Sequence, residues 1–362
     1  MNREFTPTTA ITYPPLLRAW AALTCGVTFP LVVLGSLVTT YRVGMADPLW
    51  PTAPWHLLLI EWVEPKPGFL VEHAHRIFGY AAGTLILVQT LWFWLGVPSR
   101  IKRVGAVMAI ALIASGVGMG MRLVQLAEVR SLAALGNAGF SSALVGAVAL
   151  LFLVWTDLTE RNAGRWQRAL AVFVYLGVIV QGMFGGLRVY LNELSGPQLA
   201  LVHGVFAQVV FSLTALLALM TTARWTSFED LETNPMLRRA TVAMTGLVFL
   251  QIVFGGLLRH FDHLPIALRL HPLLAFGVLA LATWIAAVGG SLRRKAVALV
   301  ILVLCQAAFG IETWLRTSDA LSRYQSVTTP DVLVRTTHVL LGFGIFASAV
   351  LLAARAWKPK LI

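Results

Sequence analysis

Four histidines could carry chemistry in this chain, because each lies near the start of a long apolar segment. They are His75, His203, His271 and His338. All four segments run in the same direction, which places the imidazoles at a matching depth. A histidine inside a membrane-spanning segment is rare and usually functional. Since imidazole is a common axial ligand of haem iron, four at one depth indicate haem binding.

The segments that must position these histidines are membrane helices. The chain has 362 residues, of which 58% are hydrophobic and only 12% charged, and its mean hydropathy is +0.78. Apolar runs of about 20 residues predict an all-α, polytopic membrane protein. The runs are Ala19–Thr40, His73–Leu95, Val104–Met121, Ala133–Trp155, Ala169–Val189, Ala200–Thr222, Ala240–Leu258, Leu270–Val288, Ala296–Leu315 and Val334–Arg355.

The net charge of +12 reflects membrane orientation rather than nucleic-acid binding. The larger share of the 28 Lys and Arg residues falls in loops on the side of the two termini. By the positive-inside rule, both termini are expected in the cytoplasm and the histidines toward the outer side. The predicted partner is therefore a lipid bilayer, and no nucleic acid.

A helical hairpin repeats along the chain. Its first helix ends in a motif such as Gln181–Arg188 or Gln251–Arg259, with glycines before an arginine, and its second helix begins near a histidine. The glycines let neighbouring helices approach closely. The hairpin of the third and fourth runs departs from the pattern. The spacing from Arg188 to His203, applied to Arg122, lands on Asn137, so this hairpin has lost its ligand.

The arginines of the repeat have two interpretations. They mark the membrane interface, or they hold carboxylates such as haem propionates by bidentate pairing. The pairing of the histidines is also open, because four imidazoles from different helices allow two bis-histidine sites in more than one combination. Zinc or copper is less well supported, since no cysteine or carboxylate set accompanies each histidine. Cys25 and Cys305 both fall inside predicted helices.

Glu72 precedes His75 on the same helix face. It can be a first-turn charge that stabilises the helix and pairs with Arg76. Alternatively, it is a carboxylate beside a haem that moves a proton or steadies a developing charge. Glu312 and Arg316 have the same spacing as Glu72 and Arg76, and we interpret them as an ion pair with a structural role.

Together these motifs resemble the haem A synthase family. The resemblance rests on the Gly-Met-Ala and Trp-Pro loop at 44–51, the Glu-x-x-His-Arg motif at 72–76, the Gln-x-x-x-Gly-Gly helix ends, and the later histidines. It spans most of the chain except the third and fourth helices. Family members usually have eight helices, so these two form an inserted hairpin, and the outer-loop cysteine pair of some members is absent here.

The resemblance implies a function and a division of labour between two bundles. Residues 1–230 would form an N-terminal bundle, with the inserted hairpin at about 100–160, and residues 231–362 a C-terminal bundle. The haem sites that the resemblance implies are a substrate site with His75, His203, Arg76 and Arg188, and a haem b site with His271, His338, Arg259 and Arg316.

The implied reaction oxidises the C8 methyl of haem O to a formyl group in the inner membrane, with Glu72 as the catalytic carboxylate. Haem b would relay electrons from an unknown donor, and the farnesyltransferase that makes haem O is an implied partner. Two other classes fit bis-histidine pairs: a di-haem electron-transfer cytochrome, and a haem transporter or assembly factor. Glu72 favours the enzyme, and transporter sites usually lie nearer the bilayer midplane.

Overall fold

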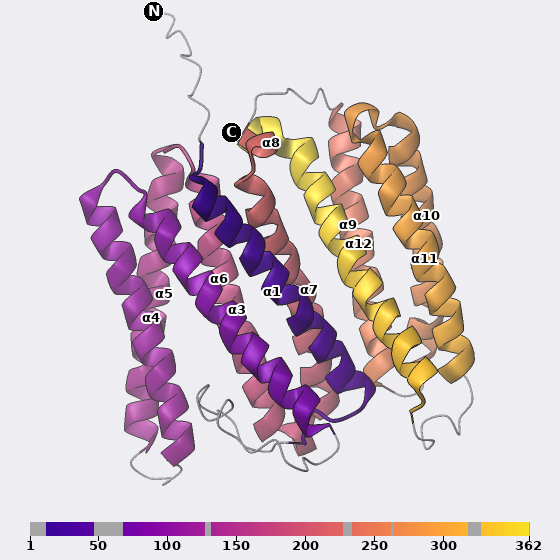
Figure 1. The fold of residues 1–362 in the computed structure, drawn as a ribbon, viewed down its shortest axis with the longest axis horizontal. Coiled ribbons are helices and arrows are strands. Elements are labelled where there is room, and N and C mark those ends of the chain that lie inside the picture. The colour runs from indigo at the N-terminus through magenta and orange to yellow at the C-terminus, as the bar shows by residue number, and fades with distance from the viewer. Residues whose placement is uncertain are drawn as a thin grey trace, which may run out of the picture.

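The computed structural model describes residues 12–46, 68–126, 132–226, 234–261, 264–317 and 327–361. Every element in these ranges is a helix, which confirms the all-α prediction (Figure 1). Ten helices are long and apolar enough to cross a membrane, so the chain is a multi-pass membrane protein. They are α1 (Pro15–Thr40), α3 (Phe69–Leu95), α4 (Arg100–Leu126), α5 (Leu132–Thr159), α6 (Arg165–Tyr190), α7 (Asn192–Met220), α9 (Pro235–His260), α10 (Pro265–Val288), α11 (Arg293–Thr317) and α12 (Thr329–Leu361). The short elements are α8 (Ala223–Thr226) and the 3-10 turn η1 (Gly290–Leu292).

The ten helices match the ten predicted apolar runs, and most extend several residues beyond them. The largest difference is at α7, which begins at Asn192 instead of near Ala200. The backbone is non-helical at Ser195 and helical on both sides of it, and Pro197 fits the first turn of the second part. Apolar runs stop where polar residues begin, whereas a helix continues into the interface, so hydropathy understates helix length.

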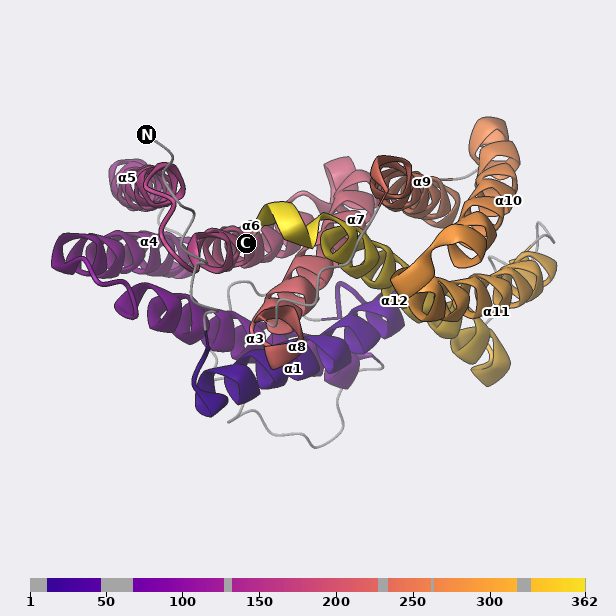
Figure 2. The same cartoon turned by 90° about the horizontal axis from the view of Figure 1, so that it is seen from above.

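The long helices form two packed groups that lie side by side and contact each other. Helices α1, α3, α6 and α7 pack together, as do α9, α10, α11 and α12. The last helix, α12, also packs on α7 and α1, so it joins the groups (Figure 2). Helix α1 begins, and α12 finishes, at one end of the molecule, here called the terminal end (Figure 1). The opposite end is called the histidine end.

The α4–α5 hairpin packs outside the first group. Helix α4 lies against α3, and α5 lies against α6 (Figures 1 and 2). An ion-pair network fastens the hairpin at the terminal end. Asp157 of α5 accepts a 2.7 Å hydrogen bond from Arg168 of α6, and Lys102 of α4 donates one of 2.7 Å to Glu160. From the sequence, the basic residues here were expected only to orient the chain in the membrane. In the structure, they also form ion pairs that connect α4, α5 and α6.

The packed core of the second group lies toward the terminal end. Its buried cluster includes Met244 on α9, Ile285 on α10, Leu299 on α11 and Leu352 on α12. Residues 251–260 of α9, all of which the structure describes, include no fully buried residue. Protein interiors are normally close-packed. Side chains therefore fill this bundle less completely at the histidine end than at the terminal end.

Candidate functional site

The structure brings the four histidines together in two pairs. The ring centroids of His75 and His203 lie 6.4 Å apart, and those of His271 and His338 also lie 6.4 Å apart. The partners come from α3 and α7 in one group and from α10 and α12 in the other. A metal–imidazole bond is about 2 Å, so two such bonds to one iron would place the ring centroids about 6 Å apart. The observed spacing fits a haem iron between the two rings of each pair.

Each histidine packs against a glycine on the preceding long helix of its hairpin. A Cβ added at the glycine would lie 2.8 to 3.4 Å from the histidine Cε1 in all four cases. The glycine and histidine partners are Gly35 and His75, Gly185 and His203, Gly255 and His271, and Gly310 and His338. The glycines had been interpreted as points where helix backbones approach. Their specific contact is with an imidazole ring, and a larger residue at the closest of them would push the ring aside.

Backbone carbonyls orient two of the rings. His75 Nδ1 lies 3.1 Å from the carbonyl oxygen of Leu31, and His271 Nδ1 lies 3.0 Å from that of Gln251. A carbonyl oxygen can only accept, so the Nδ1–H donates and Nε2 keeps its lone pair for a metal. Both carbonyls belong to the residue four positions before the glycine that packs on the ring. Gln251 begins one of the repeated sequence motifs, but the motif does not indicate that the backbone carbonyl of this residue accepts a hydrogen bond from the histidine.

Three of the four histidines have a glutamine amide beside the ring. The Nε2 atoms of Gln251 and His271 lie 3.4 Å apart, those of Gln306 and His338 also 3.4 Å, and those of Gln181 and His203 3.3 Å. Leu31 stands at the matching position of α1, so the ring of His75 has an apolar side chain where the others have an amide. The site around His75 therefore differs from the other three.

The two helices of the α4–α5 hairpin have close backbone contacts. A Cβ at Gly116 would overlap the backbone oxygen of Gly139 and lie 2.6 Å from the nitrogen of Ala143. The two helix backbones therefore touch at Gly116 and Gly139, about one turn before Met119, which matches Gly185 in the repeat. The side chain of Asn137 lies outside the described residues, and Arg122 is exposed.

Glu72 is buried beside the first pair. It accepts a 2.8 Å hydrogen bond from Arg76, and these two side chains are 6% and 10% exposed. Gly68 begins the helix in the left-handed region at φ 83°, with Val43 of the α1 end packed where its Cβ would be. This contact fixes the start of α3, and thereby the first turn that carries Glu72.

Three arginines from different helices converge at the histidine end. Arg259 of α9 donates to the Ser36 carbonyl oxygen at 3.3 Å and to Thr40 Oγ1 at 2.9 Å, both on α1. It lies close enough to Arg188 and to Arg335 for each of them to repel its charge. Such a group of partly buried cations is stabilised by anions nearby.

Several buried polar atoms at this level have no hydrogen-bond partner among the described residues. They include Nε of Arg188 and Arg335, and Oε1 of Gln181, Gln251 and Gln306. Buried polar groups in native proteins are nearly always satisfied, so such atoms point to a missing partner. Carboxylates such as haem propionates would satisfy the arginines. Arg335 was not singled out from the sequence, because it follows an outer loop instead of ending a glycine-rich helix.

The predicted arginines divide into three environments. Arg76 pairs with Glu72, and Arg188 and Arg259 belong to the convergent group. Arg316 donates 2.7 Å and 3.4 Å hydrogen bonds to the carboxylates of Glu312 and Asp331. The structure therefore places Arg316 in a local ion-pair network, with two acids already beside it.

A further histidine lies inside the first helix group. His73, the first residue of the predicted apolar run His73–Leu95, is fully buried in α3 and stacks on Phe69 with ring centroids 4.0 Å apart. His260 is partly buried at the end of α9, and His56 and His263 lie outside the described residues.

Comparison with known proteins supports the motif resemblance. Residues 138–272 match the model of the COX15-CtaA family, described as cytochrome oxidase assembly protein. The matched range contains His203 and His271 with their preceding glycine-rich helix ends, and it excludes Glu72, His75 and His338. No curated protein matches the chain significantly. Over residues 138–272, the match confirms the resemblance to cytochrome oxidase assembly proteins of the haem A synthase family that the sequence motifs predicted.

Proposed function

We propose that this protein is a membrane oxidoreductase of haem A biosynthesis, which oxidises the C8 methyl of haem O to a formyl group. The observation that carries the proposal is the equal 6.4 Å spacing of the two histidine pairs, which suits one haem iron in each. Bound haem would supply the redox chemistry at both sites. The family match supports the wider role in cytochrome oxidase assembly.

The two sites are assigned by the residue three positions before each histidine. Glu72 precedes His75, whereas the other three histidines have Ala200, Leu268 and Arg335 at this position. Residues three apart on a helix are neighbours. The α3–α7 pair therefore has a carboxylate one turn before a histidine, at a position where the other three histidines have none, so we assign it to the haem O substrate and the α10–α12 pair to haem b.

The chain's own groups would perform three tasks at the substrate site. The Leu31 carbonyl holds the tautomer of His75 that leaves Nε2 free to bind. Arg76 keeps the Glu72 carboxylate in one position, from which it can accept or return a proton as the substrate is oxidised. Arg188, whose guanidinium is attracted to Glu72 and lies over Gly44, is placed to bind a propionate.

The orientation follows from charge. Loops at the terminal end carry most of the Lys and Arg residues, which favours a cytoplasmic location for both termini in an inner membrane. The haem sites would then lie toward the outer side. Haem O, the farnesyltransferase that makes it and an electron donor remain the proposed partners.

The decisive test is the pigment made in living cells. The chain should be expressed in a host that makes haem O but no haem A, and haem extracted from the membranes should be separated and identified. Haem A that appears with the wild-type chain, and disappears in the His75→Ala variant, would support the enzyme. A purified protein with two low-spin haems and no haem A in the membranes would instead indicate the di-haem electron-transfer cytochrome.

A further inference from the structure

Arg259 makes a side-chain contact between the two helix groups. It lies on α9 of the second group, yet its Nη2 atom donates hydrogen bonds to the Ser36 carbonyl oxygen at 3.3 Å and to Thr40 Oγ1 at 2.9 Å. Both acceptors belong to α1 of the first group. Ser36 and Thr40 are only 6% and 3% exposed, so the guanidinium enters a packed interface. One side chain thus connects two groups that each contain a histidine pair.

On α9, the same helix turn carries Arg259 and a contact of the α10–α12 pair. Gly255 lies four residues before Arg259, so the two residues share a face of the helix. Gly255 packs on the ring of His271. The backbone that sets the position of this ring therefore also sets the position of the guanidinium.

On α1, Arg259 holds the turn that supports the α3–α7 pair. Gly35 packs on the ring of His75, and a Cβ at Gly35 would lie 2.9 Å from Cε1 of that ring. Ser36 follows directly, and its carbonyl oxygen also accepts a 2.8 Å hydrogen bond from Thr40 Oγ1. The bonds from Arg259 therefore fix the end of α1 immediately after the glycine that contacts the ring.

A purely structural connection between α9 and α1 would not need a charge. The acceptors on α1 are a neutral carbonyl and a neutral hydroxyl, and Arg188 and Arg335 lie close enough to repel the guanidinium of Arg259. Among the residues that the structure describes, no carboxylate pairs with Arg259. Within the same part of the chain, its Nε and Nη1 atoms donate no hydrogen bond, so they can bind an anion.

The first helix group treats a buried arginine differently. At the terminal end, Arg168 has the carboxylate of Asp157 at 2.7 Å, so the chain supplies the anion itself. Arg259 lies beside a proposed haem site, where a propionate is the anion expected. Arginine binds carboxylates well, because its planar guanidinium can donate two parallel hydrogen bonds.

We propose that Arg259 couples the two haem sites. This inference rests on the proposed function, because it requires a haem in each histidine pair. Arg259 binds a propionate of haem b and holds the end of α1 through Nη2. Haem b thereby keeps the guanidinium in place, and the ordered end of α1 supports His75 for the substrate haem. Arg259 is a positioning residue, because it acts on the substrate site through α1.

Coupling of this kind is reciprocal. If haem b raises the affinity of the α3–α7 pair for haem, then haem in that pair raises the affinity for haem b by the same factor. Couplings between sites in proteins are typically about 5- to 150-fold. A single charged side chain carries the connection here, so we expect a coupling factor of about ten, at the lower end of that range.

The test is a titration of the full-length protein, purified from haem-depleted cells, with ferric protoporphyrin IX, which carries the propionates of haem b. His271→Ala/His338→Ala disables one pair, and His75→Ala/His203→Ala disables the other. Each variant gives the association constant of the remaining site. The coupling factor is the product of the two association constants of the intact protein divided by the product of these two single-site constants.

Two substitutions on the connection should lower the coupling factor. Arg259→Gln removes the charge and should bring the factor close to unity while also weakening haem b binding. Thr40→Val removes only the shorter contact on α1, so it should reduce the factor and leave the single-site affinity for haem b unchanged. Thr28→Val is the matched control, because Thr28 is also buried on α1 and its hydroxyl bonds the Cys25 carbonyl at 2.7 Å.

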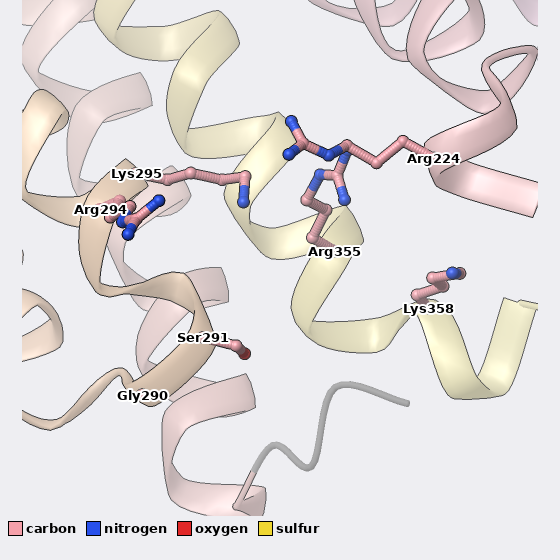
Figure 3. Close-up of a pocket in the computed structure, with 7 residues that line it drawn as sticks. All are labelled: Arg224, Gly290, Ser291, Arg294, Lys295, Arg355 and Lys358. Carbon is pink, nitrogen blue, oxygen red and sulfur yellow. The ribbon is translucent and has the colours of Figure 1, made fainter. Parts of the chain in front are cut away.

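Arg294→Gln controls for the loss of one positive charge. Arg294 is exposed and lines a basic pocket of about 350 Å³ at the terminal end, the opposite end from Arg259 (Figure 3). Because it is far from both histidine pairs, its replacement should leave the coupling factor at the wild-type value.

The outcomes separate this inference from the proposed function. A coupling factor that falls in Arg259→Gln and Thr40→Val, and is kept in both controls, supports the coupling. A wild-type factor of unity, or an equal fall in the controls, overturns it and leaves the proposed function standing, because haem A formation in cells is measured separately. If either pair of the wild type binds no haem, both the coupling and the proposed function are wrong.

Discussion

Gly255→Ala is the sharpest test of the haem b site, because it adds one methyl group beside one proposed ligand. The new Cβ would lie 2.8 Å from Cε1 and 3.3 Å from Nδ1 of His271. Ordinary van der Waals contact begins at 3.4 Å, so the ring must move by at least about 0.6 Å. A metal–ligand distance tolerates only about 0.2 Å.

The movement also disturbs the hydrogen bond that orients the ring. His271 Nδ1 donates to the Gln251 carbonyl at 3.0 Å, and this carbonyl lies on the helix that carries the new methyl group. Loss of such an orienting contact typically weakens metal binding 10- to 100-fold. We therefore expect Gly255→Ala to lose the low-spin haem b spectrum or to convert it to a high-spin form.

The assay is the absorption spectrum and haem content of the purified protein, followed by titration with haem. Gly246→Ala is the matched control, because it lies on the same helix and its Cβ would meet nothing within 4 Å. Gly185→Ala provides a graded comparison, since its Cβ would lie at an ordinary 3.4 Å from His203. If Gly255→Ala binds haem b with the wild-type spectrum and affinity, the close packing of glycine on imidazole is irrelevant and the site assignment fails.

Three further perturbations test other parts of the molecule. Glu72→Gln should keep haem b but abolish haem A formation in cells, because the amide cannot accept a proton; normal haem A would reduce Glu72 to a helix-end charge. Asp157→Asn should lower the free energy of unfolding by about 3 kcal/mol, since it leaves the buried Arg168 without its carboxylate, and unchanged thermal stability would contradict the network. Arg259→Gln should weaken haem retention more than Arg316→Gln, because Arg316 already has two carboxylates beside it; the reverse order in haem content after gel filtration would show that Arg316 holds the propionate.

Much of the fold follows from local sequence properties. A membrane helix must satisfy its backbone hydrogen bonds internally and be about 20 apolar residues long, so each span can be identified from its own residues. The glycine–arginine helix ends and the histidines after them also repeat within short stretches. The sequence therefore predicted the ten spans, the hairpin repeat and the matched depth of the histidines, and the structure confirms the spans.

The organisation of the site depends on contacts between distant residues. His75 meets His203, and Arg259 reaches Thr40, only because the helices pack as they do. The Leu31 carbonyl that orients His75 is a backbone atom, which every residue possesses, so no residue type could reveal it.

The burial of individual side chains was also decided by tertiary structure. His73 stands at the edge of an apolar run, yet packing against neighbouring segments buries it completely. The basic residues of the terminal end look alike in sequence, but some are neutralised by Asp157 while others line an open pocket. Hydropathy and periodicity describe one helix at a time, whereas burial, charge pairing and ring orientation are set by what the neighbouring helices place beside each residue.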